Sequence, residues 1–229
     1  MTALVRAFDA KQVGAAILDS PELLAVRDER GRNWLHLCCS VDIKGDKRAA
    51  AASVRTADVL LEHGLGLDAE AFTEDGWKAT PLWYAVGRGH NLVLAEHLLK
   101  LGCNPNYALW AAAFRDDFAA IKLLVRYGAI VDDPAADETP FVGAVKVSHF
   151  ESAELLLKLG ADVNAVDGRG MTALHYMLKK GSDKQHFRML VKYGARGDIP
   201  DPAGRTAAEI MRKKKDPDFA KLAERCQSQ

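Results

Sequence analysis

Long apolar runs are absent from this sequence, and no stretch approaches the roughly 18 consecutive apolar residues that a membrane-spanning helix requires. The first residues also lack the unbroken apolar core of a signal peptide, because Arg6, Asp9, Lys11 and Asp19 interrupt it. Cysteine is scarce, with 4 residues in 229, which is too few for a disulfide scaffold. These absences predict a cytoplasmic protein in a reducing compartment, with no membrane partner.

Neither sign of charge predominates, because 31 Lys and Arg residues balance 31 Asp and Glu residues. The total charge therefore does not indicate a nucleic-acid-binding protein. Aromatic residues make up 7% of the chain, and strand-favouring runs of Val, Ile and Thr are rare. Leu, Ala, Lys and Glu recur instead, and all four favour helices. The composition predicts an all-α protein.

A leucine-rich segment that ends in glycine recurs along the chain. Its closing glycines are Gly64, Gly102, Gly128, Gly160 and Gly194. The last two intervals are 32 and 34 residues (160−128 and 194−160), close to a known helical repeat period of about 33 residues. Glycine suits the left-handed conformation that ends many helices. The spacing predicts helix pairs that bury their apolar faces against neighbouring pairs.

A second motif lies in phase with the first. It occurs as TPLWYA at 80–85 and as MTALH at 171–175, with weaker copies at 33–36 and 139–144. The threonine can cap the first turn of a helix, and proline at the first helical position loses nothing by lacking an N–H. An Asp-x-x-Gly turn precedes two of these copies, at Asp28 and Asp167, and recurs at Asp201 where the last cap begins. Together the two motifs resemble the ankyrin repeat over residues 1–225.

The resemblance implies an all-α ankyrin-repeat solenoid that forms a single domain over residues 1–229. About five helix pairs with short hairpin-like fingers lie between two atypical capping pairs, as in stand-alone ankyrin proteins of bacteria. In the amino-terminal cap we expect Leu4, Val5, Phe8, Val13, Ile17 and Leu18 to point inward. The expected segments are a cap at 1–27, repeats at 28–68, 69–106, 107–132, 133–166 and 167–199, and a cap at 200–229.

Two segments depart from the repeat. Residues 41–55 form an insertion whose polar turn and alanines predict an extended second helix. In the third repeat, by contrast, Gly102 is followed almost directly by the next helix, so the finger is missing. We expect a notch in the row of fingers beside Trp110 and Phe114.

No motif in the chain indicates catalysis, a cofactor or a metal site. The pair Cys38–Cys39 occupies a small-residue position of the repeat and has no metal-ligand spacing around it. The segment GRGMTA at 168–173 resembles a nucleotide-binding loop, but it opens a repeat rather than a βαβ unit. The basic run Arg212–Lys215 suits a solvated capping helix, although a nuclear or nucleic-acid signal is the alternative. We therefore predict a protein that is not an enzyme.

Ankyrin repeats bind through finger tips and the inner side of the first helices, and the resemblance places these positions here. Most of them are basic or apolar, so the balanced total hides a positive face. The candidate partner-binding residues are Arg30, Arg32, Trp77, Lys78, Arg88, Trp110, Phe114, Arg115, Lys146, Arg169, Met171, Lys179 and Lys180.

We expect a monomeric adaptor that binds an acidic segment of another protein, with Trp77 and Phe114 as apolar anchors. Three alternatives remain open at this point. The cations could be scattered and solvated, the same face could bind a nucleic acid or another polyanion, or the chain could be an accessory or enzymatic domain with a cryptic site. Salt dependence separates the second alternative, because phosphate contacts release counterions.

Overall fold

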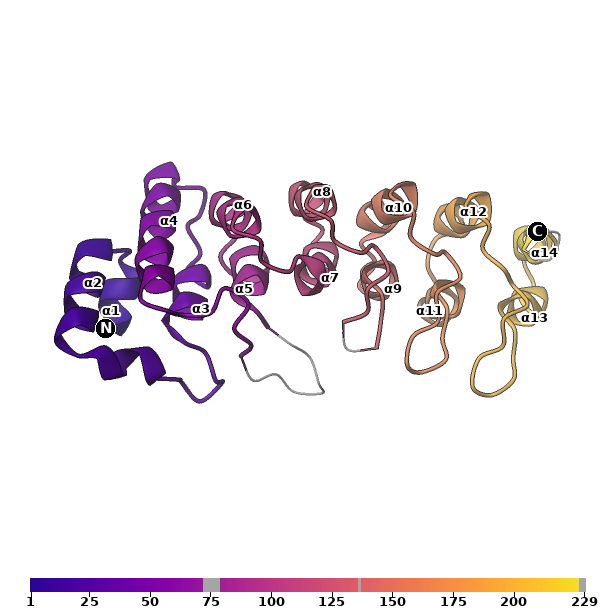
Figure 1. Ribbon diagram of the computed structural model, residues 1–229. Helices are drawn as coiled ribbons and strands as arrows, with labels where there is room; N and C mark the ends of the chain where they lie inside the picture. Colours follow the sequence, from indigo (N-terminus) through magenta and orange to yellow (C-terminus); the bar gives the residue numbers. More distant parts are fainter. Residues whose placement is uncertain (72–78, 136, 227–229) are drawn as a thin grey trace. The chain divides into compact units, whose positions relative to one another are not determined.

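The computed structural model describes residues 1–71, 79–135 and 137–226. Its contacts divide the chain into two compact units, each made of helices joined by short loops (Figure 1). Unit 1 comprises Met1–Ala112 and Ala119–Ile130, and unit 2 comprises Ala113–Phe118 and Val131–Gln229. Among the described residues, no helix is both long and apolar enough to span a bilayer.

Unit 1 begins with the amino-terminal cap and continues with helix pairs, each made of a first and a second helix. Its elements are α1 (Thr2–Arg6), α2 (Ala10–Asp19), the short 3₁₀ helix η1 (Pro21–Ala25), α3 (Trp34–Cys39), α4 (Lys47–Glu62), α5 (Pro81–Gly87), α6 (Leu92–Lys100), α7 (Asn106–Phe114) and α8 (Phe118–Arg126). The end of α7 and the first residue of α8 belong to the segment Ala113–Phe118, which is part of unit 2.

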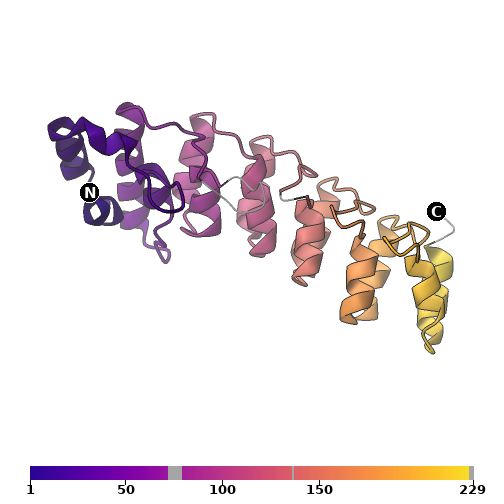
Figure 2. The same ribbon diagram turned by 90° about the horizontal axis from the view of Figure 1, so that it is seen from below.

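Unit 2 repeats the same pairing. Its helices are α9 (Pro140–Lys146), α10 (Phe150–Lys158), α11 (Ala173–Lys180), α12 (Lys184–Lys192), α13 (Ala207–Arg212) and α14 (Pro217–Arg225). The first helices α9, α11 and α13 lie side by side in both views (Figures 1 and 2), and the second helices lie above them in Figure 1. The all-α prediction is confirmed.

The helix ends follow the predicted capping chemistry. The side chains of Thr80, Thr139 and Thr206 each accept a hydrogen bond from a backbone N–H of the first turn. The glycines that close the second helices all have positive φ, from 87° at Gly194 to 100° at Gly160. A side chain with a Cβ would strain this left-handed backbone, so glycine ends each repeat.

The core consists of the leucines of the second helices and the small residues of the first. Leu98, Leu156 and Leu190 are fully buried, whereas Leu123 is half-buried. In the amino-terminal cap Val5, Val13 and Ile17 are buried as expected, but the inward prediction for Leu18 is wrong, because its side chain is 75% exposed. Ile17 already fills the buried stripe of α2, and the next helical residue is turned about 100° away from it.

The two irregular segments differ in structure. The insertion forms a polar turn and then α4, which has 16 residues and is the longest of the helices in the described segments. Residues 101–106 form a tight turn into α7 without a finger. Elsewhere, isolated β-bridges close the fingers, as between Val166 and Thr172.

Side chains in the linking loops tie each repeat to the next. The Asp132 carboxylate accepts the N–H of Asp162 at 3.0 Å, and the Asn164 carbonyl oxygen accepts the N–H of Arg196 at 2.7 Å. Unit 1 has two equivalent bonds: the N–H of Asn104 donates to the Asp68 carboxylate and the N–H of Ile130 donates to the Asn106 carbonyl oxygen, both at 2.9 Å. An oxygen at this position is therefore needed, whether it is charged or neutral.

We expect Asp132→Asn to stabilise the protein. Burial and the nearby Asp162 carboxylate raise the pKa of Asp132, so its ionised form is disfavoured in the folded chain. Asparagine keeps the oxygen that accepts the Asp162 N–H and removes the charge, as Asn106 and Asn164 show. The free energy of unfolding at pH 7 should rise by about 0.5–1 kcal/mol in urea titrations.

The matched control is Asp133→Asn, which removes the same charge one residue away, outside this set of bonds. Equal effects of the two substitutions would show that net charge, rather than the buried position of Asp132, is responsible.

Candidate functional site

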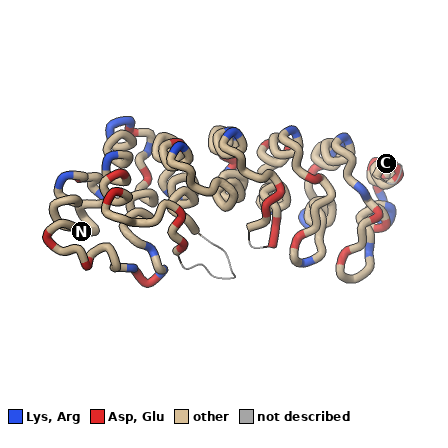
Figure 3. The backbone as a smooth tube through the Cα atoms, viewed as in Figure 1, with Lys and Arg blue, Asp and Glu red and all other residues tan. Residues whose placement is uncertain are grey.

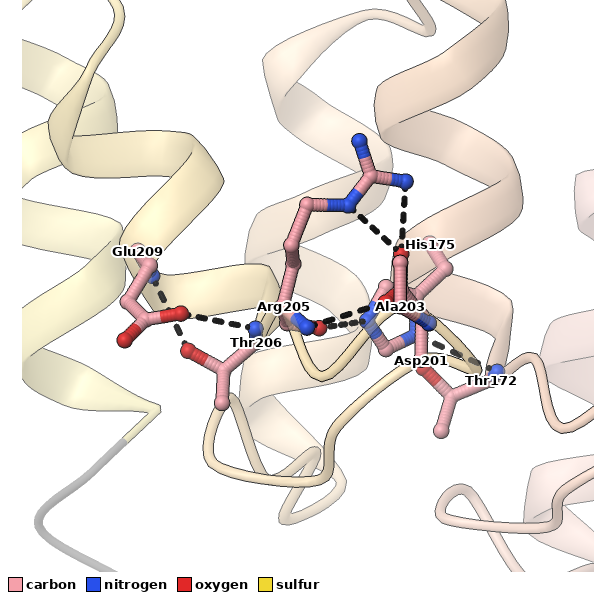
Figure 4. Close-up of polar contacts among 7 residues, drawn as sticks. All are labelled: Thr172, His175, Asp201, Ala203, Arg205, Thr206 and Glu209. Atoms are coloured by element: carbon pink, nitrogen blue, oxygen red, sulfur yellow. Dashed lines mark hydrogen bonds and ion pairs between the residues drawn. The ribbon is translucent and has the colours of Figure 1, made fainter.

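The fingers are held in shape by aspartates. Asp167 accepts the backbone N–H groups of Arg169 and Met171, and Asp201 accepts those of Ala203 and Arg205. Figure 4 shows the Asp201 turn, which lies directly before the cap of α13 at Thr206. Asp28 forms the same turn in unit 1. Because the carboxylate satisfies two donors in each turn, the tip residues are presented on a rigid loop.

Two finger arginines form ion pairs with these same carboxylates. The guanidinium of Arg32 lies 2.7 Å from Asp28, and that of Arg205 lies 2.8 Å from Asp201. The side chain and backbone N–H of Arg205 hold the pKa of Asp201 below its usual value. Arg32 and Arg205 are therefore largely neutralised within their own turns.

Histidines connect a first helix to the following finger. His36 Nε2 lies 2.8 Å from the carbonyl oxygen of Ala69, and His175 Nε2 lies 3.3 Å from that of Arg205. The other ring nitrogen of each histidine contacts the residue that caps its own helix, Asn33 or Thr172. Burial lowers the pKa of His36 to about 4 even though carbonyl hydrogen bonds favour its charged form.

Lys146, one of the candidate binding residues, lies in a polar network of unit 2. Its ammonium pairs with Glu138, lies 3.9 Å from Asp167 and sits 5.1 Å from the ring centroid of Tyr176. The Tyr176 hydroxyl donates to Asp167, and burial together with this bond raises the pKa of Tyr176. Lys180 donates to the carbonyl oxygen of Lys146. The sequence prediction did not foresee that these two lysines have partners within the chain.

The other candidates fall into three groups. Trp77 and Lys78 lie outside the described residues. Trp110 and Met171 are half-buried in α7 and at the base of a finger. The remaining candidates have exposed side chains: Arg30, Arg88, Phe114, Arg115, Arg169 and Lys179.

Charges of both signs share the finger loops, where blue and red segments lie next to one another (Figure 3). Asp28, Asp167 and Asp201 were counted in the sequence as turn residues and not as charges of the binding face. With the pairs of Arg32, Arg205 and Lys146 included, the positive excess is smaller than the sequence suggested.

Unit 2 contains a groove of about 480 Å³ between α11, the last finger and α13. It brings together two candidates, Met171 and Lys179, with residues that the sequence analysis had not singled out. The groove is lined by Met171, His175, Leu178, Lys179, Asp201, Pro202, Ala203, Arg205 and Ile210.

Leu178, Pro202 and Ile210 were missed because the last helix pair was treated as a solvated cap. A signal was present, however. Ile210 stands at the position that Tyr176 occupies in the preceding repeat, four residues after the capping threonine. A cap without a partner would carry a polar residue there.

Nothing in the described residues fits a metal or a reactive thiol. No cluster of three or more His, Cys, Asp or Glu side chains in the described segments could hold a metal ion. Cys38, Cys39, Cys103 and Cys226 are buried free thiols, and burial raises the pKa of Cys38 and of Cys103 to about 12. A protonated, buried thiol is a poor nucleophile, so these cysteines pack as small apolar residues.

Comparison with known proteins agrees with this architecture. Family models described as ankyrin repeats match residues 82–167 and 144–192. The ankyrin repeat domain of Bcl-3 superposes with a TM-score of 0.72 at 20% identity over 97% of this chain and 96% of that one. The human ASB11 ankyrin repeat domain gives 0.70 at 19% identity, over 98% and 96%. The fold is the all-α ankyrin-repeat solenoid, and residues 82–192 match ankyrin-repeat family models.

Similar curated proteins are much longer. Inversin of Canis lupus familiaris is 30% identical over 63% of this chain and 14% of its own length. Human ankyrin repeat and SOCS box protein 6 is 29% identical over 65% of this chain and 30% of its own length. The chain thus spans less than a third of these relatives. Ankyrin repeat domains are generally non-catalytic modules of protein–protein interaction.

His36 should make the stability of unit 1 depend on pH. Its pKa is about 4 in the folded chain and about 6.5 when unfolded, so only the unfolded state takes up a proton between these values. The contribution of neutral His36 to the free energy of unfolding is therefore fully present above pH 6.5 and is lost as the pH falls toward 4. We expect a loss of about 2 kcal/mol between pH 7 and pH 5 in urea titrations, which His36→Gln removes. An unchanged pH slope in this variant would contradict the assignment.

Lys146 should contribute to stability, whereas Lys179 should not. Lys146→Met keeps the aliphatic stem against Tyr176 but leaves Glu138 and the buried Asp167 without their cation. We expect a loss of about 1–2 kcal/mol in the free energy of unfolding. Lys179→Met, the matched control at an exposed position, should change it by less than about 0.5 kcal/mol. Equal effects would show that the ion pairs of Lys146 contribute nothing measurable.

Proposed function

We propose that this chain is a non-catalytic adaptor that binds an acidic segment of another protein through its finger tips and inner helix face. The observation that carries the proposal is the groove between α11 and α13. It combines an apolar wall of Met171, Leu178 and Ile210 with the exposed ammonium of Lys179 at its rim. An apolar side chain next to a carboxylate complements both features.

Each unit contributes its own exposed cations. Arg30 and Arg88 are available in unit 1, and Arg115, Arg169 and Lys179 in unit 2. Phe114, which is 42% exposed on α7, supports the proposed role as an apolar anchor. Trp77 and Lys78 keep their proposed roles, and both lie outside the described segments.

Arg32, Lys146 and Lys180 have a structural role rather than a binding role. Their charges are used within the chain, so they orient the fingers and helices that carry the exposed residues. Contacts with a partner then fall mainly to the exposed set. This division separates residues whose loss destabilises the fold from those whose loss weakens binding.

A polyanion such as a nucleic acid is the alternative partner for the same face. The interleaved aspartates of the finger turns oppose it, because a phosphate backbone would approach Asp28, Asp167 and Asp201 together with the arginines. We further propose a reducing compartment such as the cytoplasm, and the four buried free thiols support it.

The test is charge reversal of the exposed set. The variant Arg88→Glu, Arg115→Glu, Lys179→Glu should lose most of the partner that the wild-type chain captures from its native lysate, as measured by quantitative mass spectrometry. The matched control Lys11→Glu, Lys47→Glu, Lys221→Glu changes the net charge equally at exposed lysines outside the proposed face. Retention of the partner by the first variant, or equal loss in both, would contradict the proposal.

The salt dependence of binding distinguishes a nucleic-acid partner from a protein partner. A nucleic-acid partner should bind with a steep linear fall of log affinity against log salt, by roughly one counterion for each phosphate contact. A protein partner anchored in the apolar groove should show a shallow slope and should be lost when Ile210→Arg narrows the groove.

A further inference from the structure

A second groove lies on the opposite side of unit 1 from the fingers, between the second helices α6 and α8 (Figure 1). Its volume is about 440 Å³. Leu92 and Val93 of α6 and Ala119 and Leu123 of α8 supply its apolar surface. Val93 is 55% exposed there, and Leu123 is half-buried, whereas the next residue, Leu124, lies in the core like Leu98 and Leu156 at the same position of other repeats.

Neighbouring second helices elsewhere are joined by side chains at this level. In unit 2, Phe150 of α10 stacks on His186 of α12 with 3.7 Å between ring centroids. Lys184 of α12 pairs with Asp216 and Asp218 beside α14, at 2.6 and 3.0 Å. Between α6 and α8 the Arg126–Glu96 ion pair bridges the two helices, and the exposed Val93 and Ala119 lie on the same groove.

The sequence shows why the groove is open. Val93 and Ala119 stand nine residues before the closing glycines Gly102 and Gly128 (102−93 and 128−119). The same position carries Glu151 in α10 and Gln185 in α12, long polar side chains that suit an exposed helix face. In unit 1, α4 carries the long polar Arg55 at this position, nine residues before Gly64, whereas α6 and α8 carry short apolar residues, which leaves an apolar surface facing solvent.

The rim of the groove is basic. Arg126 pairs with Glu96 at 2.9 Å, Lys100 lies 3.5 Å from the same carboxylate, and the Tyr127 hydroxyl donates to it. Three donors therefore surround one carboxylate oxygen of Glu96, and the exposed Lys122 adds a further positive charge. The charge of the rim complements a carboxylate and opposes a basic segment.

We propose that the groove between α6 and α8 is a second docking surface, which takes an apolar side chain flanked by carboxylates from another protein. It lies on a different face from the fingers, so a partner there and a partner on the inner face do not compete. A groove of this volume accommodates the side chains of one or two residues. The chain would then join two proteins rather than capture one.

The experiment uses the full chain labelled with ¹⁵N and three synthetic hexapeptides. Their sequences are Asp-Glu-Leu-Phe-Asp-Glu, the charge-matched Asp-Glu-Ser-Ser-Asp-Glu and the basic Lys-Lys-Leu-Phe-Lys-Lys. The first peptide should cause saturable shift changes in the amides of α6 and α8. The other two should bind at least about tenfold more weakly, because one lacks the apolar side chains and the other lacks the carboxylates.

The decisive variant is Val93→Glu with Ala119→Gln, which introduces the polar residues that α10 and α12 carry at the same position. This variant should keep the fold, as judged by thermal unfolding. Its affinity for the first peptide should be about tenfold lower than that of the wild-type chain, or lower still. Lys122→Glu, a milder variant that leaves the apolar surface intact, should also lower the affinity for the first peptide. The matched control Lys179→Glu, in the inner groove, should leave this binding unchanged.

Three results would overturn the proposal. These are the absence of saturable shifts in α6 and α8, equal binding of the serine peptide or the basic peptide, and loss of binding in Lys179→Glu but not in Val93→Glu with Ala119→Gln. The last result would place the peptide on the inner face, in agreement with the proposed function alone. Failure of the charge-reversal experiment on the inner face would not affect the groove between α6 and α8.

Discussion

Burial of apolar surface between neighbouring helix pairs is the constraint on which the structure of each unit depends. A single pair of helices of 6 to 10 residues cannot enclose its own leucines, so Leu98, Leu156 and Leu190 are covered only because another pair lies beside them. Each fully buried leucine is worth roughly 1.5–3 kcal/mol, which is large against the net stability of a domain. Thr caps, Ala spacers and closing Gly residues all serve this stacking.

Stacking also brings the edges of the repeats close together, where polar groups must find partners. Aspartates fold the fingers, His36 and His175 reach the next finger, and Asp132 and Asn164 bond the next linking loop. A polar side chain used in this way is no longer available to a partner. The residues that we propose for binding are those that the stack does not use, such as Lys179 and the apolar wall beside it.

Departures from the repeat are what distinguish one ankyrin stack from another. The extended α4, the missing finger before α7 and the apolar residues Val93 and Ala119 each break the period at a different face. A regular repeat would present the same surface along its whole length. The irregular positions give this chain individual features at which specific partners can be recognised.

The sequence alone determined the helical class, the phase of the repeat, the capping residues and the two irregular segments, because these depend on local periodicity and on the few residue types that each backbone conformation allows. It also identified which residues stand at finger tips and on first helices. Only the tertiary structure decided which of their charges are free. Lys146 contacts Asp167 and Tyr176 of the next repeat, and Ile210 of the cap lines the same groove as Leu178 of α11, although each pair is more than twenty positions apart. Such pairings are set by stacking geometry, which no local pattern of residues encodes.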